Sequence, residues 1–136
     1  MSTPSEQKKP EQWLKEFHDA FGIPSFINQD SYGRTRMLEL RMRLIREEFL
    51  EVMDELLDAK NGKANLRNIA KELADLCVVT IGTAQLMEIP FTQVFEEVMR
   101  SNISKVNADG TINVRADGKI LKPLTYKAPD LTFLPA

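Results

Sequence analysis

The sequence predicts an all-α protein, a helical bundle followed by a short irregular or hairpin extension. Two long stretches, residues 32–60 and 65–87, consist mainly of helix-forming residues, contain no proline and hold one glycine each. In both stretches apolar residues recur at the three-and-four spacing of a helix with one buried face. Asn61 and Gly62 end the first stretch and Pro90 follows the second, because glycine closes helices and proline cannot continue them.

Two shorter helices are expected, one before and one after the long pair in the chain. Pro10 can open the first, because proline fits the first turn of a helix, and apolar residues then recur at helical spacing up to Phe21. The second covers residues 91–104. Residues 1–10 are mostly polar and are expected to form a disordered tail, which leaves residues 11–136 as a single domain.

The chain changes character after residue 104. Turn signals at residues 107–110 and 116–118 flank residues 111–115, in which apolar and polar side chains alternate. Prolines recur in the last part of the chain. This pattern predicts a small hairpin or an irregular extension.

Length and charge exclude several classes of protein. The 136 residues fit one compact domain, and the net charge of −2 offers no electrostatic attraction to nucleic acid or to anionic membranes. A single cysteine, Cys77, excludes an intramolecular disulfide, and its apolar neighbours suggest a buried thiol. No run approaches the ~20 apolar residues of a membrane span. We expect a soluble cytoplasmic protein with no nucleic-acid or membrane partner.

Acidic side chains occupy unexpected positions on the first long helix. Successive residues turn by about 100°, which places Glu48 between Leu44 and Val52, inside the apolar stripe. Glu51 falls on one edge of the same stripe. Solvated acids should instead occupy the opposite face, as Asp54 does.

The second long helix repeats this arrangement. Its apolar residues cover almost the whole circumference, so the helix should be buried on most sides. Glu72 and Asp75 fall between Leu76 and Val79 on this helix. Because burial of an unpaired carboxylate is strongly unfavourable, a cation must offset its charge.

A metal ion is the cation that we expect. The basic side chains that could serve instead, Arg46, Arg67 and Lys71, lie to the side of the acidic face. Two pairs of carboxylates, each three residues apart, can converge when their helices pack antiparallel, and an all-oxygen ligand set suits Mg²⁺ or Mn²⁺. The alternative is that each pair belongs to a solvated or salt-bridged helix face.

The same residues resemble the signature of a known superfamily. Residues 47–51 and 72–75 read EEFLE and ELAD, which is similar to the EExxE and ExxD motifs of the all-α nucleoside triphosphate pyrophosphohydrolases. These enzymes include MazG proteins, dimeric dUTPases and phosphoribosyl-ATP pyrophosphohydrolases. Residues 96–105 (EEVMRSNISK) and 117–123 (DGKILKP) extend the resemblance, which covers roughly residues 38–129.

The resemblance implies a reaction and a set of site residues. A nucleoside triphosphate is hydrolysed to the monophosphate and pyrophosphate, with dUTP as the leading substrate. The Mg²⁺ (or Mn²⁺) ligands would be Glu48, Glu51, Glu72 and Asp75. Glu47 would orient or deprotonate the attacking water. The remaining residues implied to contact the substrate, with Lys105 on a phosphate, are Asn102, Lys105, Lys119 and Lys122.

Several alternatives stay open at this stage. The substrate could be phosphoribosyl-ATP or several triphosphates in a house-cleaning role, and a non-catalytic helical dimerisation module is a further alternative. A di-iron bundle is disfavoured, because such sites use Glu-x-x-His pairs and the only histidine, His18, lies on another helix. The apolar second long helix needs covering on several sides, which predicts a homodimer or a tetramer built from dimers.

Overall fold

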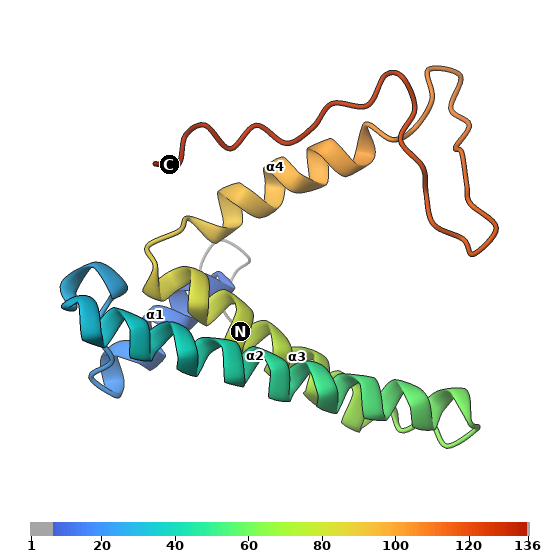
Figure 1. Cartoon of the computed structure of the whole chain (residues 1–136). Coiled ribbons are helices and arrows are strands. Elements are labelled where there is room, and N and C mark those ends of the chain that lie inside the picture. The colour runs from blue at the N-terminus through green and yellow to red at the C-terminus, as the bar shows by residue number, and fades with distance from the viewer. Residues whose placement is uncertain (1–6, 136) are drawn as a thin grey trace. The chain divides into compact units, whose positions relative to one another are not determined.

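The structure, a computed structural model, describes residues 7–135. Its helices follow one another in the order α1 (Pro10–Ala20), η2 (Phe26–Asn28), α2 (Ser31–Lys60), α3 (Leu66–Leu86) and α4 (Phe91–Ile103) (Figure 1). Between residues 7 and 135 the β-type pairing is limited to an isolated bridge between Val114 and Ile120. The prediction of an all-α fold is therefore confirmed. The chain divides into two compact units, Met1–Pro90 and Phe91–Ala136, which are described separately.

The first unit begins with α1. Pro10 occupies its first turn, where a missing N–H group breaks no helical hydrogen bond. The backbone N–H of Lys9 donates to Oε1 of Gln12 over 2.7 Å, and Lys8 Nζ lies 2.6 Å from a carboxylate oxygen of Glu16. Residues 7–9 are thus anchored to the helix, whereas residues 1–6 of the predicted tail lie outside the described residues.

The long helices α2 and α3 form an antiparallel pair that begins and ends at capping residues. Oδ1 of Asp30 accepts from the backbone N–H of Gly33 at 2.7 Å, which caps α2. Asn65 caps α3 in the same way through Asn68. Gly62, with φ of 83°, allows the reversal between the helices, since few other residues adopt this conformation without strain. The two helices lie side by side in Figure 1.

The core of this unit lies where α1 and α2 meet the C-terminal half of α3. Its buried apolar side chains are Leu14, Met37, Val52, Val79, Ile81 and Leu86. The prediction that α3 is buried on most sides is wrong for the single chain, because Leu66 is 79% exposed and Cys77 is exposed as well. The reason is geometric: two neighbouring helices cover only one side of α3. Within the described residues no single helix is long and apolar enough to span a membrane, although α3 and α4 taken as a bent pair meet that test, as core helices of other proteins do.

Two buried polar side chains join the three helices of the core. Arg41 of α2 donates from Nε to Oγ1 of Thr83 and from Nη2 to the carbonyl oxygen of Val79, each at 2.8 Å. His18 of α1 pairs its Nδ1 with Oε1 of Gln85 at 2.5 Å. Both contacts satisfy polar groups that would otherwise be buried without partners. They also fix the register of α1 and α2 along α3.

The second unit consists of α4 and the extended chain that returns along it. The predicted hairpin is present: Val114 faces Ile120, and the backbone N–H of Leu121 donates to the carbonyl oxygen of Asn113 at 2.7 Å. Gly118, with φ of 91°, lies in its turn. Expecting a hairpin or an irregular extension was therefore correct.

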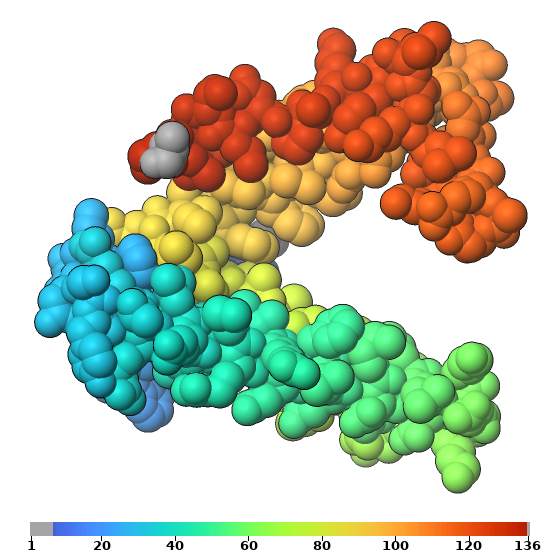
Figure 2. Space-filling model, in the orientation of Figure 1, coloured from blue at the N-terminus to red at the C-terminus, as the bar shows by residue number. Residues whose placement is uncertain are grey.

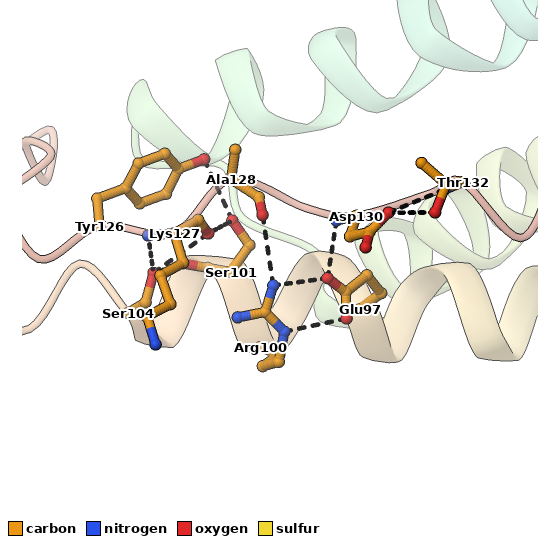
Figure 3. A network of polar contacts seen from close by, with 9 residues as sticks. All are labelled: Glu97, Arg100, Ser101, Ser104, Tyr126, Lys127, Ala128, Asp130 and Thr132. Carbon is orange, nitrogen blue, oxygen red and sulfur yellow. Dashed lines mark hydrogen bonds and ion pairs between the residues drawn. The ribbon is translucent and has the colours of Figure 1, made fainter.

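The chain after the hairpin is tied to α4 by a polar network (Figure 3). Ser101, which is 1% exposed, donates to the carbonyl oxygen of Lys127 at 2.8 Å. Glu97 accepts from Arg100 at 2.6 Å and from the backbone N–H of Asp130 at 2.8 Å. The hydrogen bonds from Arg100 and Asp130 lower the pKa of Glu97 to about 2. These contacts hold residues 126–132 against one face of α4.

Candidate metal centre

Three carboxylates converge between α2 and α3. Glu48 and Glu51 lie one turn apart on α2, and Glu72 faces them from α3. Each offers one oxygen, and these oxygens all lie within 4.8 Å of one another. We call Glu48, Glu51 and Glu72 the acidic trio. The convergence follows from the antiparallel packing of helices whose acids interrupt an apolar stripe, as the sequence predicts.

Two oxygens of the trio need a cation. Oε2 of Glu48 and Oε2 of Glu72 are buried and have no hydrogen-bond partner among the described residues. A buried acceptor without a partner carries the full desolvation penalty of the group, and the penalty is larger when the group is charged. The donor set therefore fits a hard divalent cation, because Mg²⁺ and Mn²⁺ bind carboxylate oxygens.

The electrostatics of the trio lead to the same conclusion. A side-chain hydrogen bond with Glu72 and the negative charge of Glu48 raise the pKa of Glu51 to about 7. Like charges at this separation cannot all ionise freely, so below about pH 7 Glu51 keeps its proton when no cation is bound. Deprotonation of Glu51 and binding of a cation are therefore coupled.

Asp75, the fourth predicted ligand, lies one turn after Glu72 on α3 but does not join the trio. Its Oδ2 lies 2.7 Å from Nζ of Lys71, which also lies 3.2 Å from Oε1 of Glu72. Expecting Lys71 to be peripheral was wrong, because a lysine four residues before an aspartate reaches it along the helix surface. Asp75 remains a predicted metal ligand. In this structure its carboxylate is paired with the ammonium group of Lys71.

The other predicted site residues lie outside the trio. Glu47 directly precedes Glu48, but its side chain is exposed and turned away by one helical step. Asn102 is exposed at the end of α4, and Lys105 is half-buried in the turn that follows. Their roles stay predictions.

Two further predicted phosphate contacts belong to the hairpin of the second unit. Lys119 is exposed, and its backbone N–H donates to Oδ1 of Asp117 at 3.2 Å. Lys122 places Nζ 5.0 Å from the centre of the Tyr126 ring. Neither ammonium group forms an ion pair in the described part of the chain, so both are available to a phosphate.

Comparison with known proteins identifies the family. A family model, phosphoribosyl-ATP pyrophosphohydrolase, matches residues 14–102. The chain belongs to this family. No curated protein matches the chain. The resemblance to the MazG-like, all-α nucleoside triphosphate pyrophosphohydrolases is thereby confirmed.

Membership of the phosphoribosyl-ATP pyrophosphohydrolase family fits the geometry of the site. The family indicates a pyrophosphohydrolase that acts on phosphoanhydride bonds, and its members generally use divalent metals. The matched segment includes Glu47, the acidic trio and Asp75, and it ends at Asn102. The three predicted lysine contacts, at positions 105, 119 and 122, lie beyond it.

A cluster of arginines near the start of α2 was not predicted from the sequence. Arg36, Arg41 and Arg43 line one pocket together with Tyr32. Arg41 could have been found by the reasoning that found Glu48, because it projects close to Met37 in the apolar stripe of α2. No comparable pattern marks the others, which are exposed arginines on a charged helix.

Proposed function

We propose that this chain hydrolyses the bond between the α- and β-phosphates of a nucleoside triphosphate and releases pyrophosphate, with a divalent cation held by the acidic trio and Asp75. The observation that carries the proposal is the pair of buried, unpartnered oxygens on Glu48 and Glu72. Family membership supplies the reaction class, and these oxygens supply a reason for a cation at this position.

The acidic trio by itself would repel a triphosphate. With Mg²⁺ or Mn²⁺ held by these carboxylates, much of the local negative charge would be offset, phosphate oxygens would be neutralised and the pKa of a bound water would be lowered. Asp75 can join the ligands when Lys71 moves away. That exchange costs little free energy, because the side chain of Lys71 is 66% exposed and exposed ion pairs contribute little to stability.

Other side chains of the chain would position the reactants. Glu47 is proposed to orient or deprotonate the attacking water, since it directly precedes Glu48 in the chain and its exposed carboxylate has no ion-pair partner in the described structure. Lys105 would bind a phosphate and Asn102 would contact the substrate. Lys119 and Lys122 are proposed as further phosphate contacts.

Two substrates have specific support. The family match favours phosphoribosyl-ATP. The resemblance of the chain to the small MazG-like relatives of dimeric dUTPases favours dUTP. Both carry a triphosphate, so both suit the same metal centre. They differ in the nucleobase and the sugar, and phosphoribosyl-ATP alone carries a second phosphorylated ribose on its base.

The decisive assay separates pyrophosphate from orthophosphate. The purified full-length chain is incubated with Mg²⁺ and either phosphoribosyl-ATP, dUTP or one of the other nucleoside triphosphates, and both products are measured. Pyrophosphate release from at least one substrate, abolished by a chelator, is the expected result. Release of orthophosphate alone, or no release from any substrate by a folded protein with Mg²⁺, would contradict the proposal.

A further inference from the structure

The first unit also holds a positively charged pocket, separate from the negatively charged metal centre. It has a volume of about 470 Å³ and lies between the first half of α2, the loop before α2 and Leu86 at the end of α3. Its charged lining residues are Arg36, Arg41 and Arg43, and no carboxylate lines it. We call it the arginine pocket.

Arg41 gives the pocket a buried positive charge. Its side chain is 7% exposed, and its two hydrogen bonds inside the core go to the carbonyl oxygen of Val79 and the hydroxyl of Thr83, which are both neutral. Burial lowers the pKa of Arg41, because it removes the guanidinium charge from water. Because neutral acceptors do not cancel a buried charge, an anion in the pocket would stabilise it.

The other two arginines are exposed at the pocket and free to close on a ligand. Nη1 of Arg36 donates to the hydroxyl of Tyr32 at 3.0 Å, with the guanidinium 5.6 Å from the ring centre. In the described residues neither Arg36 nor Arg43 forms an ion pair. Guanidinium groups match the geometry of carboxylate and phosphate oxygens alike, and three positive charges around one pocket suit a doubly charged phosphate better than a singly charged anion.

The arginine pocket and the metal centre lie along the same side of α2. With about 100° per residue, Arg36, Arg43 and Glu51 fall within an arc of roughly 80°. A rise of 1.5 Å per residue separates Arg36 from Glu48 by roughly 18 Å along the helix axis. An extended ligand with anionic groups at both ends can follow this side of the helix.

We propose that the arginine pocket binds a phosphomonoester group. That group has two possible sources. It could be a phosphate that the substrate carries beyond its nucleobase, as the phosphoribosyl group of phosphoribosyl-ATP does, and this source rests on the proposed function. It could also be a separate small phosphate that binds without being hydrolysed.

Binding is tested with the full-length protein, inorganic phosphate and ribose 5-phosphate, by calorimetry with Mg²⁺ and again with a chelator. The variant carries Arg36→Gln and Arg43→Gln, two exposed positions at which folding should be unaffected. The matched control carries Arg67→Gln, an exposed arginine at the other end of the helix pair. Phosphate binding that occurs both with Mg²⁺ and with the chelator should weaken at least tenfold in the variant. The same binding should be unchanged in the control.

Kinetics then identify the source of the phosphate. If the variant raises KM for phosphoribosyl-ATP at least tenfold and leaves KM for dUTP unchanged, the group is the second phosphate of the substrate. If both KM values stay unchanged while phosphate binding is lost, the group is a separate phosphate. An equal rise in both KM values would place the arginines on the triphosphate that the substrates share, and it would overturn the proposal. Absence of phosphate binding to the unmodified protein, or equal binding to the variant, overturns the proposal. Binding is measured without turnover, so failure of the proposed reaction would be recognised separately.

Discussion

At the scale of single residues, neighbouring glutamates have different surroundings. Glu48 is half-buried and carries an unpartnered oxygen, whereas Glu47 is exposed. A turn of about 100° between them accounts for the difference, since it moves one side chain into the apolar stripe and the next out of it. A mutation at Glu48 is therefore expected to weaken metal binding, whereas a mutation at Glu47 is expected to impair activation of the water and spare metal binding.

Replacement of Glu47 tests this separation. Glu47→Gln should leave Mn²⁺ affinity within about twofold of the unmodified value and lower kcat by about 10²–10⁴-fold, the usual effect of removing a general base. Calorimetry and pyrophosphate release measure the two quantities. Asp54→Asn, which changes an exposed acid of the same helix that is not part of the trio, is the control. Full turnover in Glu47→Gln would show that Glu47 is not the base.

The raised pKa of Glu51 predicts a dependence on pH. Its pKa is about 7 in the folded protein against 4.5 for an ordinary glutamate, so the folded state holds this proton more tightly than the unfolded state. The stabilisation is complete below pH 4.5 and is lost as pH rises through 7. The Tm of the metal-free protein should therefore fall between pH 5.5 and 8, and Mg²⁺ should restore it at pH 8.

The control for this measurement is Glu51→Gln, which cannot titrate. Its Tm should vary less over the same range of pH than that of the unmodified protein. A metal-free protein whose Tm is the same at both values of pH, or a Glu51→Gln variant with an unchanged dependence, would contradict the role assigned to this carboxyl.

At the scale of elements, Gly82 sets how closely α1 and α2 approach α3. A Cβ at this position would lie 3.0 Å from Nη2 of Arg41, 3.2 Å from Cδ1 of Leu14 and 3.3 Å from Cε1 of His18. Alanine favours helix over glycine by about 1 kcal/mol. The three buried neighbours cannot all yield, and overpacking costs about 1–3 kcal/mol.

We therefore expect Gly82→Ala to lower the free energy of unfolding by up to about 2 kcal/mol. Urea denaturation followed by circular dichroism measures the effect. Ala70→Ser adds one atom at an exposed position of the same helix and should change stability by less than half as much. A Gly82→Ala protein more stable than the unmodified chain would show that the helices can move apart freely.

The elements themselves were predictable because their signals are local. The proline, glycine and asparagine residues at the ends of the helices are read directly from the chain, and the predicted ends of α2, α3 and α4 lie within one residue of those observed. Glu48 and Glu72 were found for the same reason, as acids inside an apolar stripe. The ion pair of Lys71 with Asp75 and the pocket formed by Arg36, Arg41 and Arg43 depend on side-chain reach and on packing between segments, which spacing alone does not specify.

At the scale of the whole molecule, a single chain leaves a large apolar surface in contact with solvent. On α2, Met42 is 71% exposed and Leu57 is 54% exposed, and α3 exposes Leu66 and Leu73. In the space-filling view α2, coloured cyan to green, lies at the surface along much of its length (Figure 2). Exposed apolar side chains in this number suggest an interaction surface.

A homodimer, or a tetramer built from dimers, would cover this surface. Sedimentation equilibrium of the full-length chain at micromolar concentration should give twice or four times the mass of 15.5 kDa. Because unfolding would then include dissociation, Tm should rise with protein concentration. A monomeric mass together with a Tm independent of concentration would contradict the prediction.

The central claim is that the acidic trio holds a divalent cation, and titration of the full-length chain with Mn²⁺ tests it most directly. We predict saturable binding that weakens at least tenfold in Glu48→Gln and in Glu72→Gln and is unchanged in Asp54→Asn, with all variants folded by circular dichroism. Equal Mn²⁺ affinity in the unmodified protein and in both glutamine variants would contradict the claim and leave the two buried oxygens without an explanation.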